Sequence, residues 1–241
     1  MNQKVVFRSL ILVILFLLLA KAIHWVVIVS GFNPGDVELS TTFAILLFMI
    51  VFYLIAPISI GFLVKSPSEN QALVNRLNGI LDSLTWKNRV ILFDHEEKYI
   101  FTTGLLTLYS CTYLSTGMLK YLSEDGLKGV LAHELTHVRE HHILLSLITA
   151  CVVVLVVHPF ELNFMLLTGF FIFLAIRRLL EYRADVGSAK LVGKQALLKS
   201  LFELSALKPT NAQERWFVFA QPYPTLSMRI RALETGMHPL F

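Results

Sequence analysis

The stretch "LAHELTHVREHH", Leu131 to His142, holds four of the eight histidines of this 241-residue chain. His133 and His137 lie four positions apart, which on a helix places both imidazoles on one face, about one turn apart. Two imidazoles placed in this way can share one ion, and the HExxH pattern is typical of zinc sites. Glu134 lies beside them and could take a proton from a water molecule at the ion. The stretch therefore predicts a helix that carries part of a zinc site.

The other two histidines of the stretch, His141 and His142, stand in its charged end, "REHH". His141 follows His137 by four residues, so these two form a geometrically possible ligand pair. That pair would leave Glu134 without a role. We therefore expect His141 and His142 to be interfacial or supporting groups and not ligands.

The helix that carries the motif has a clear start signal. Ser123 is a plausible N-cap, and Glu124 and Asp125 in the first turn favour the positive end of a helix. We expect this helix to run from there through His142.

Composition points to a membrane protein. Hydrophobic residues make up 55% of the chain and charged residues only 16%, whereas a soluble domain usually carries about a quarter charged residues. The net charge of +4 is small, and no basic run interleaved with aromatics suggests a nucleic-acid groove. Cys111 and Cys151 fit no CxxC pattern, which supports neither a disulfide framework nor a cysteine-rich zinc site.

Two long apolar runs, Val5 to Val29 and Thr41 to Val64, can each cross a bilayer of roughly 30 Å. The start of the first run also resembles a signal peptide, with "AKA" as a small-x-small cleavage site. Apolar sequence resumes directly after it, so we expect a retained helix. Pro57 and Gly61 are expected to kink the second run near one end.

Two shorter apolar runs follow, Ile143 to Val157 and Phe164 to Ile176. Lengths near these fit either a buried hairpin or membrane insertion, and we favour insertion. Positive charges mark one side of all four runs as cytoplasmic; they are Lys4, Arg8, Lys65, Arg76, Arg177 and Arg178. We expect a multi-pass protein of the inner (plasma) membrane, with the N-terminus and the active site cytoplasmic.

Between the two pairs of runs the composition is globular. Apolar residues at helical spacing from Leu73 to Leu84 predict an amphipathic helix. "RVILFD", "HEEK" and "YIFTT" look like strand, turn and strand, and "LLTLYS" (Leu105 to Ser110) could add another strand. A further amphipathic helix is expected from about Ser188 to Lys208, with a short helix at the C-terminus. The predicted division is 1–65 (two spans), 66–142 (first catalytic part), 143–180 (apolar hairpin) and 181–241 (second catalytic part).

A catalytic zinc needs a third protein ligand. His158 and Glu161 lie in the loop expected outside, on the wrong side of the membrane. Glu181 and Asp185, in "LLEYRAD", follow the returning helix at i, i+4 spacing, so Glu181 can face the zinc while Asp185 supports a histidine ligand. The alternative interpretation of Glu181 and Asp185 is that they belong to a solvated cluster of charged residues and bind no metal.

HExxH on one helix and ExxxD on a later one resemble the glutamate-zincin pattern. With an apolar hairpin between the motifs, the chain is similar to the HtpX-like and CAAX prenyl protease-like integral membrane metallopeptidases from about Val90 to Leu233. The resemblance includes a later histidine at His142 and the segment "EYRAD". It implies one zinc ion per chain; the ligands would be His133, His137 and Glu181, with Glu134 as general base and Asp185 as support.

Two further assignments follow from the same resemblance. The strand in "KYIFTTGLL" looks like the family strand that pairs with an extended substrate; its residues are Tyr99, Ile100, Phe101 and Thr102. The family usually carries a His-Pro pair and then an arginine near the C-terminus, and here "YPTLSMR" places Tyr223 where the histidine would be. A tyrosine hydroxyl can donate to a developing oxyanion, or Tyr223 merely packs beside the prolines. Arg229 is expected to be structural or to support the site.

We therefore expect a mainly α membrane protein of about four transmembrane helices plus a small α+β zincin-type catalytic domain with a short sheet. The expected function is zinc-dependent cleavage of membrane or membrane-proximal proteins, with protein or peptide substrates and the lipid bilayer as partners. The alternative is a non-catalytic membrane protein whose zinc is structural, acting as a regulatory or interaction partner. A metal-ion transporter would need ionisable residues facing one another inside the spans, which Lys21 and His24 do not supply.

Overall fold

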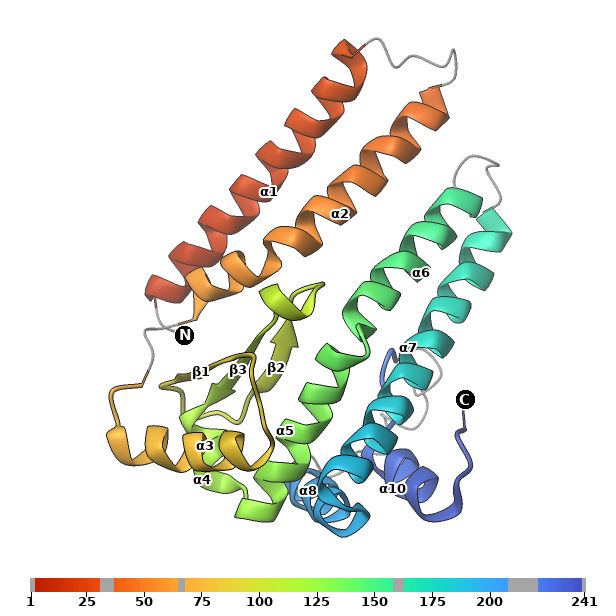
Figure 1. Ribbon diagram of the computed structural model, residues 1–241. Coiled ribbons are helices and arrows are strands. Elements are labelled where there is room, and N and C mark those ends of the chain that lie inside the picture. The colour runs from red at the N-terminus through yellow and green to blue at the C-terminus, as the bar shows by residue number, and fades with distance from the viewer. Residues whose placement is uncertain (1–2, 31–36, 65–67, 158–162, 208–220, 240–241) are drawn as a thin grey trace. The chain divides into compact units, whose positions relative to one another are not determined.

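The computed structural model describes residues 3–30, 37–64, 68–157, 163–207 and 221–239 (Figure 1). The chain divides into two compact units, Met1–Lys65 with Leu144–Phe173 and Ser66–Ile143 with Leu174–Phe241. The helices are α1 Gln3–Val29, α2 Val37–Leu63, α3 Gln71–Ser83, α4 Thr116–Tyr121, α5 Glu124–Arg139, α6 His142–Val157, α7 Asn163–Val192, α8 Lys194–Leu207 and α10 Leu226–Thr235. The strands are β1 Arg89–Phe93, β2 Ile100–Thr103 and β3 Cys111–Ser115.

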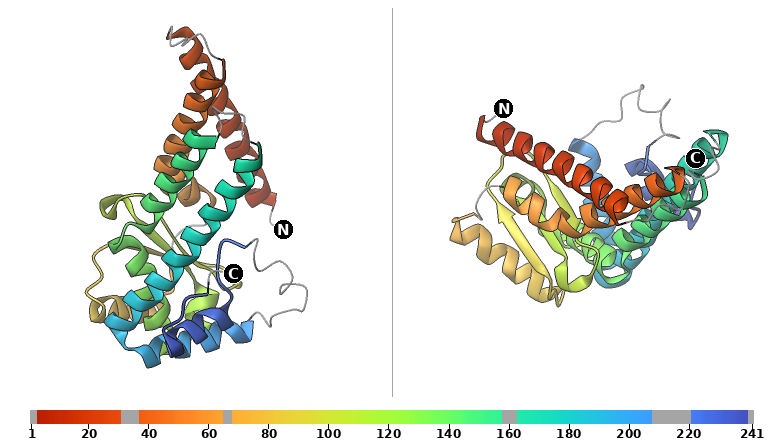
Figure 2. Two further views of the ribbon diagram at one scale, coloured as in Figure 1. Left: turned by 90° about the vertical axis from the view of Figure 1, so that its right-hand side faces the viewer. Right: turned by 90° about the horizontal axis from the view of Figure 1, so that it is seen from above.

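In the first unit, α1 and α2 lie side by side (Figures 1 and 2). Each contains a segment long and apolar enough to cross a membrane, Ile11–Val29 and Thr41–Leu63. Among the described residues these are the two candidate spans, or three if α5 and α6, bent by 52° at their junction, count as one. The predicted count of four spans is thus not confirmed: α6 has only 16 residues, and the second short run is the first half of the 30-residue α7.

The second unit contains a three-stranded mixed sheet with the order β1-β3-β2. β3 runs parallel to β1 and antiparallel to β2, with Phe101 opposite Tyr113. The third strand is Cys111–Ser115, so the prediction of a strand over Leu105 to Ser110 is wrong. The chain turns at Gly104, which has φ +107, and Leu108 is 93% exposed, whereas every residue of β3 is buried, as expected of a central strand.

The zinc-motif helix α5 begins where its start signal predicts. The Ser123 side chain accepts a hydrogen bond from the Gly126 N–H at 3.1 Å. Ser123 in turn donates from its N–H and its hydroxyl to the Glu203 carboxylate of α8, at 3.0 and 2.6 Å. The predicted end is wrong: α5 stops at Arg139, because His141 adopts φ +54 and breaks the helix before α6.

Small residues bring α7 close to α5. A Cβ on Gly187 of α7 would collide with the Thr136 side chain of α5. Ser188 donates a hydrogen bond to the Gly129 carbonyl at 3.0 Å. α7 runs unbroken through Val192 (Figure 2), so the helix predicted from about Ser188 in fact begins at Lys194, after Gly193 at φ +86. This close approach sets the second half of α7 against the histidines.

Gly187→Ala is expected to lower the free energy of unfolding by about 1–3 kcal/mol, because the added methyl group overpacks the contact with Thr136. Gly79→Ala in α3 is the matched control: its Cβ meets no atom within 4 Å, so it should be neutral or stabilising by up to about 1 kcal/mol. Melting temperatures in detergent measure both changes. Equal melting temperatures for the two variants would contradict the close packing of α5 and α7.

Candidate metal centre

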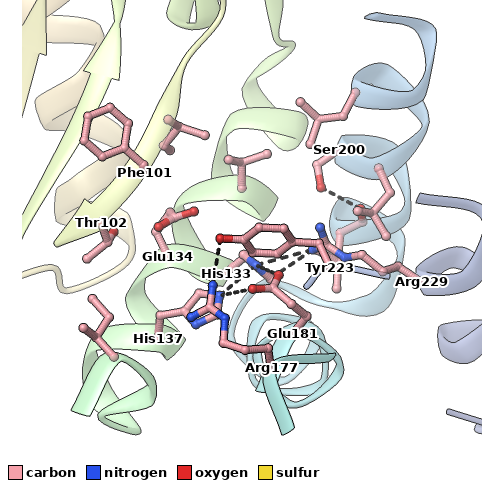
Figure 3. Close-up of a pocket in the computed structure, with 16 residues that line it drawn as sticks. Phe101, Thr102, His133, Glu134, His137, Arg177, Glu181, Ser200, Tyr223 and Arg229 are labelled. Carbon is pink, nitrogen blue, oxygen red and sulfur yellow. Dashed lines mark hydrogen bonds and ion pairs between the residues drawn. The ribbon is translucent and has the colours of Figure 1, made fainter. Parts of the chain in front are cut away.

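Three potential ligand side chains converge from two helices (Figure 3). His133 and His137 project from successive turns of α5, and their Nε2 atoms are 3.1 Å apart. The Glu181 carboxylate of α7 lies 3.3 Å from the first of these nitrogens and 3.6 Å from the second. An ion held at 2.0–2.1 Å in tetrahedral geometry would place its ligand atoms about 3.3 Å from one another. Two imidazole nitrogens and one carboxylate at these spacings fit a zinc ion.

The electrostatic environment favours neutral His137. Burial and the charge of the neighbouring His133 together lower the pKa of His137 to about 3, although the Glu181 carboxylate acts in the opposite direction. A neutral imidazole keeps the lone pair that a metal requires.

Asp185 contacts His133 at Nδ1, the ring nitrogen that does not face the other potential ligands, and Arg229 contacts Asp185. The Nδ1 atom of His133 lies 3.0 Å from Asp185 Oδ1, so a proton on Nδ1 would leave Nε2 free for an ion. Arg229 of α10 donates to the same carboxylate from Nε at 2.8 Å and also from Nη2. Burial alone would raise the pKa of Asp185, but the Arg229 charge and the hydrogen bonds from Arg229 and His133 hold it well below its usual range.

His142 contacts the other histidine, His137. Its ring is 1% exposed, and its Nδ1 atom lies 3.0 Å from Nδ1 of His137. Its Nε2 atom is 3.3 Å from the Glu140 carboxylate, which also pairs with Arg183. His141 is exposed and is no member of the three-ligand cluster.

Glu134 faces a cavity of about 330 Å³ that the three potential ligands also line. Burial raises the pKa of the Glu134 carboxyl, and the charge of His133 and a hydrogen bond from Thr102 offset this in part. Ile100, Phe101 and Thr102 of β2 line the same cavity. Tyr99 is the one residue of the predicted substrate strand that does not line this cavity. Its hydroxyl donates a hydrogen bond to the Glu97 carboxylate.

Tyr223 also lines the cavity and is 50% exposed. Its hydroxyl accepts a hydrogen bond from Arg177 Nη2 at 2.7 Å. In the sequence, Arg177 was interpreted only as a charge that flanks an apolar run. Its spacing is a further signal, because Arg177, Glu181 and Asp185 recur every four residues and therefore share one helix face.

Comparison with known proteins identifies the family and the fold. Residues 67–236 match peptidase family M48. Protease HtpX of Mannheimia succiniciproducens is 27% identical over an alignment of 191 residues, and the match covers 62% of this chain and 67% of that protein. A protease HtpX homolog of Burkholderia thailandensis is 42% identical over 62 residues, 26% of this chain and 22% of that protein. The crystal structure of S. mikatae Ste24p has the same fold, with a TM-score of 0.72 and 20% identity over 96% of this chain and 66% of that one.

Proposed function

This chain belongs to peptidase family M48, and we propose that it is a zinc-dependent endopeptidase that cleaves membrane or membrane-proximal proteins. The predicted resemblance to HtpX-like and CAAX prenyl protease-like membrane metallopeptidases is confirmed. The observation that carries the proposal is the cluster of His133, His137 and Glu181 beside the Glu134 carboxylate. In this proposal the first three hold one zinc ion per chain. The test is cleavage of an unstructured reporter protein in detergent, which a chelator should abolish and which metal-free protein should not perform.

Zinc, when bound, would polarise the scissile carbonyl and lower the pKa of the attacking water. Glu134 accepts the proton of that water and later delivers it to the leaving amine. Burial raises the pKa of this carboxyl, and a raised pKa makes a carboxylate a better proton acceptor. The Tyr223 hydroxyl donates a hydrogen bond to the oxygen that becomes negative as water attacks.

Asp185 acts on the reaction through His133, whose ring it orients, and Arg229 holds Asp185 in place. Asp185→Asn is expected to weaken zinc binding about 10- to 100-fold, because the amide is a poorer acceptor for the His133 N–H. Competition with a fluorescent zinc chelator measures the affinity. Asp82→Asn on the exposed side of α3 is the control and should bind zinc like the wild type. Wild-type affinity in Asp185→Asn would show that Asp185 does not support the ligand.

The substrate is proposed to add as a strand to β2, which is an edge strand of the sheet that the described residues form. The Tyr99 carbonyl accepts from the Ser115 N–H at 3.0 Å. Backbone groups alternate in direction along an antiparallel strand. The N–H groups of Ile100 and Thr102 therefore face the outer edge, where an extended peptide can accept from them.

Ile100→Pro is expected to lower kcat/KM about five- to tenfold, because it removes one outward hydrogen-bond donor without removing a bond to β3. Ile100→Val keeps the N–H and is the matched control. Steady-state kinetics with a quenched fluorescent peptide measure both. An Ile100→Pro variant as active as Ile100→Val would remove the support for substrate pairing at this edge.

The four-span arrangement, the inner-membrane location and the cytoplasmic site complete the proposal. Its support is the distribution of positive charge along the sequence together with the two candidate spans of α1 and α2. The functional division into 1–65, 66–142, 143–180 and 181–241 is part of the same proposal.

A further inference from the structure

Arg177 and Tyr223 form a pair at the mouth of the candidate metal centre. Both line the cavity that contains Glu134 and the three potential ligands. Arg177 donates from Nη2 to the Tyr223 hydroxyl at 2.7 Å, and its guanidinium carbon lies 5.1 Å from the centre of the ring. Figure 3 shows the hydroxyl turned towards Arg177, on the side of the pocket where Glu134 lies. The pair is therefore part of the reaction cavity and not of the outer surface alone.

The chemistry of the pair determines which group donates the hydrogen bond between Arg177 and Tyr223. A guanidinium has five N–H donors and no acceptor, so the Tyr223 oxygen can only accept in this bond. Its own O–H is then left to donate to a third group. Accepting a hydrogen bond from a cation also makes that O–H a stronger donor. The pair thus presents a polarised donor to the cavity.

The arginine that follows holds the backbone of the same segment. Arg178 is fully buried, and its Nε atom donates to the Gln221 carbonyl at 3.1 Å. α7 therefore holds this segment at two points. Arg178 binds the backbone at Gln221, and Arg177 binds the hydroxyl of Tyr223. Since Arg177 lies one turn before Glu181 on the same helix face, the proposed ligand and the phenol are positioned by one rigid element.

We propose that Arg177 is a positioning residue that aims the Tyr223 O–H at the oxygen of the tetrahedral intermediate. This inference rests on the proposed function, since it assumes peptide hydrolysis at this centre. Removing one such donor from an enzyme typically lowers kcat by about 100- to 1000-fold. Arg177 acts through the phenol, so its loss should lower kcat only when the phenol is present.

Kinetics of single and double variants test this dependence. Tyr223→Phe is expected to lower kcat about 100-fold and Arg177→Met about tenfold, with KM and zinc content unchanged. The double variant should resemble Tyr223→Phe alone, and Arg177→Lys should recover part of the loss because it keeps a charged donor. Lys190→Met, which removes an exposed positive charge from α7, is the control and should behave as wild type. Losses that multiply in the double variant would overturn the inference.

Binding of a phosphinic peptide provides a readout without turnover. Its tetrahedral anion resembles the intermediate, so Arg177→Met should weaken its binding to the zinc-loaded protein about tenfold. Binding of the matching amide peptide, measured in the Glu134→Gln background, should not change. If wild-type cleavage depends on Glu134 while Arg177→Met alters neither kcat nor phosphinic-peptide binding, this inference alone fails. If Glu134→Gln cleaves like the wild type, the proposed function fails instead.

Discussion

Glu134→Gln is expected to lower peptide hydrolysis by at least about 100-fold while zinc stays bound at wild-type affinity. Glutamine has nearly the same shape but cannot take the proton of the attacking water. Zinc should remain, because the three potential ligands are other residues, His133, His137 and Glu181. Reporter cleavage and zinc content, measured on the same purified sample, separate the two effects.

The control for this variant is Glu234→Gln, which removes an exposed carboxylate from α10. It should cleave the reporter at the wild-type rate. Cleavage by Glu134→Gln at a similar rate would contradict the role of Glu134. Loss of zinc together with activity would instead place the Glu134 carboxylate among the groups that hold the ion.

His133→Ala and Glu181→Ala are each expected to lose both zinc and cleavage. Each removes one of three ligand atoms, so the loss of affinity should exceed the about 10- to 100-fold effect of a supporting group such as Asp185. Zinc analysis after dialysis against a weak chelator measures the retained metal. The carboxylate variant is the more informative of the two, because Glu181 lies 44 residues after His137 and on another helix.

His141→Ala is the matched control, since it removes a histidine from the same stretch. His141 is exposed and itself adopts the φ of +54 that ends α5, so it should be dispensable for zinc. The alternative ligand pair of His137 and His141 predicts the reverse: His141→Ala would lose the ion and His133→Ala would keep it.

Local signals predicted the centre of the fold well. The HExxH spacing, the Ser123 cap and the i, i+4 spacing of Glu181 and Asp185 each depend on residues within one helix, and helical geometry fixes them. The end of α5 and the position of β3 depend instead on the backbone at His141 and Gly104, where positive φ angles turn the chain. Composition alone does not indicate these turns, and a histidine at positive φ is uncommon.

Residues that act between distant segments were harder to predict. Arg177 contacts Tyr223 across 46 positions, and the sequence between them contains no pattern that joins the two. The burial of His142 against His137 likewise depends on the bend between α5 and α6. The resemblance to a known family included a histidine at the position of His142, but it could not indicate Arg177, because the family histidine is a tyrosine here.

A structural zinc site is the main alternative to catalysis. Such sites are closed by four protein ligands, whereas catalytic sites keep one position for water or substrate. The cluster found among the described residues has three potential ligands. A carboxylate at Glu134, in the same cavity, has no role in a purely structural site. These two features favour catalysis.

The most direct test is a zinc titration of the metal-free protein, with reporter cleavage measured at each addition. Cleavage should be absent at the start, rise in proportion to zinc and reach its maximum at one ion per chain. Glu134→Gln should bind the same amount of zinc and remain inactive throughout. Cleavage by the metal-free wild type, or a wild type that binds one zinc ion and cleaves no better than Glu134→Gln, would contradict a zinc-dependent peptidase.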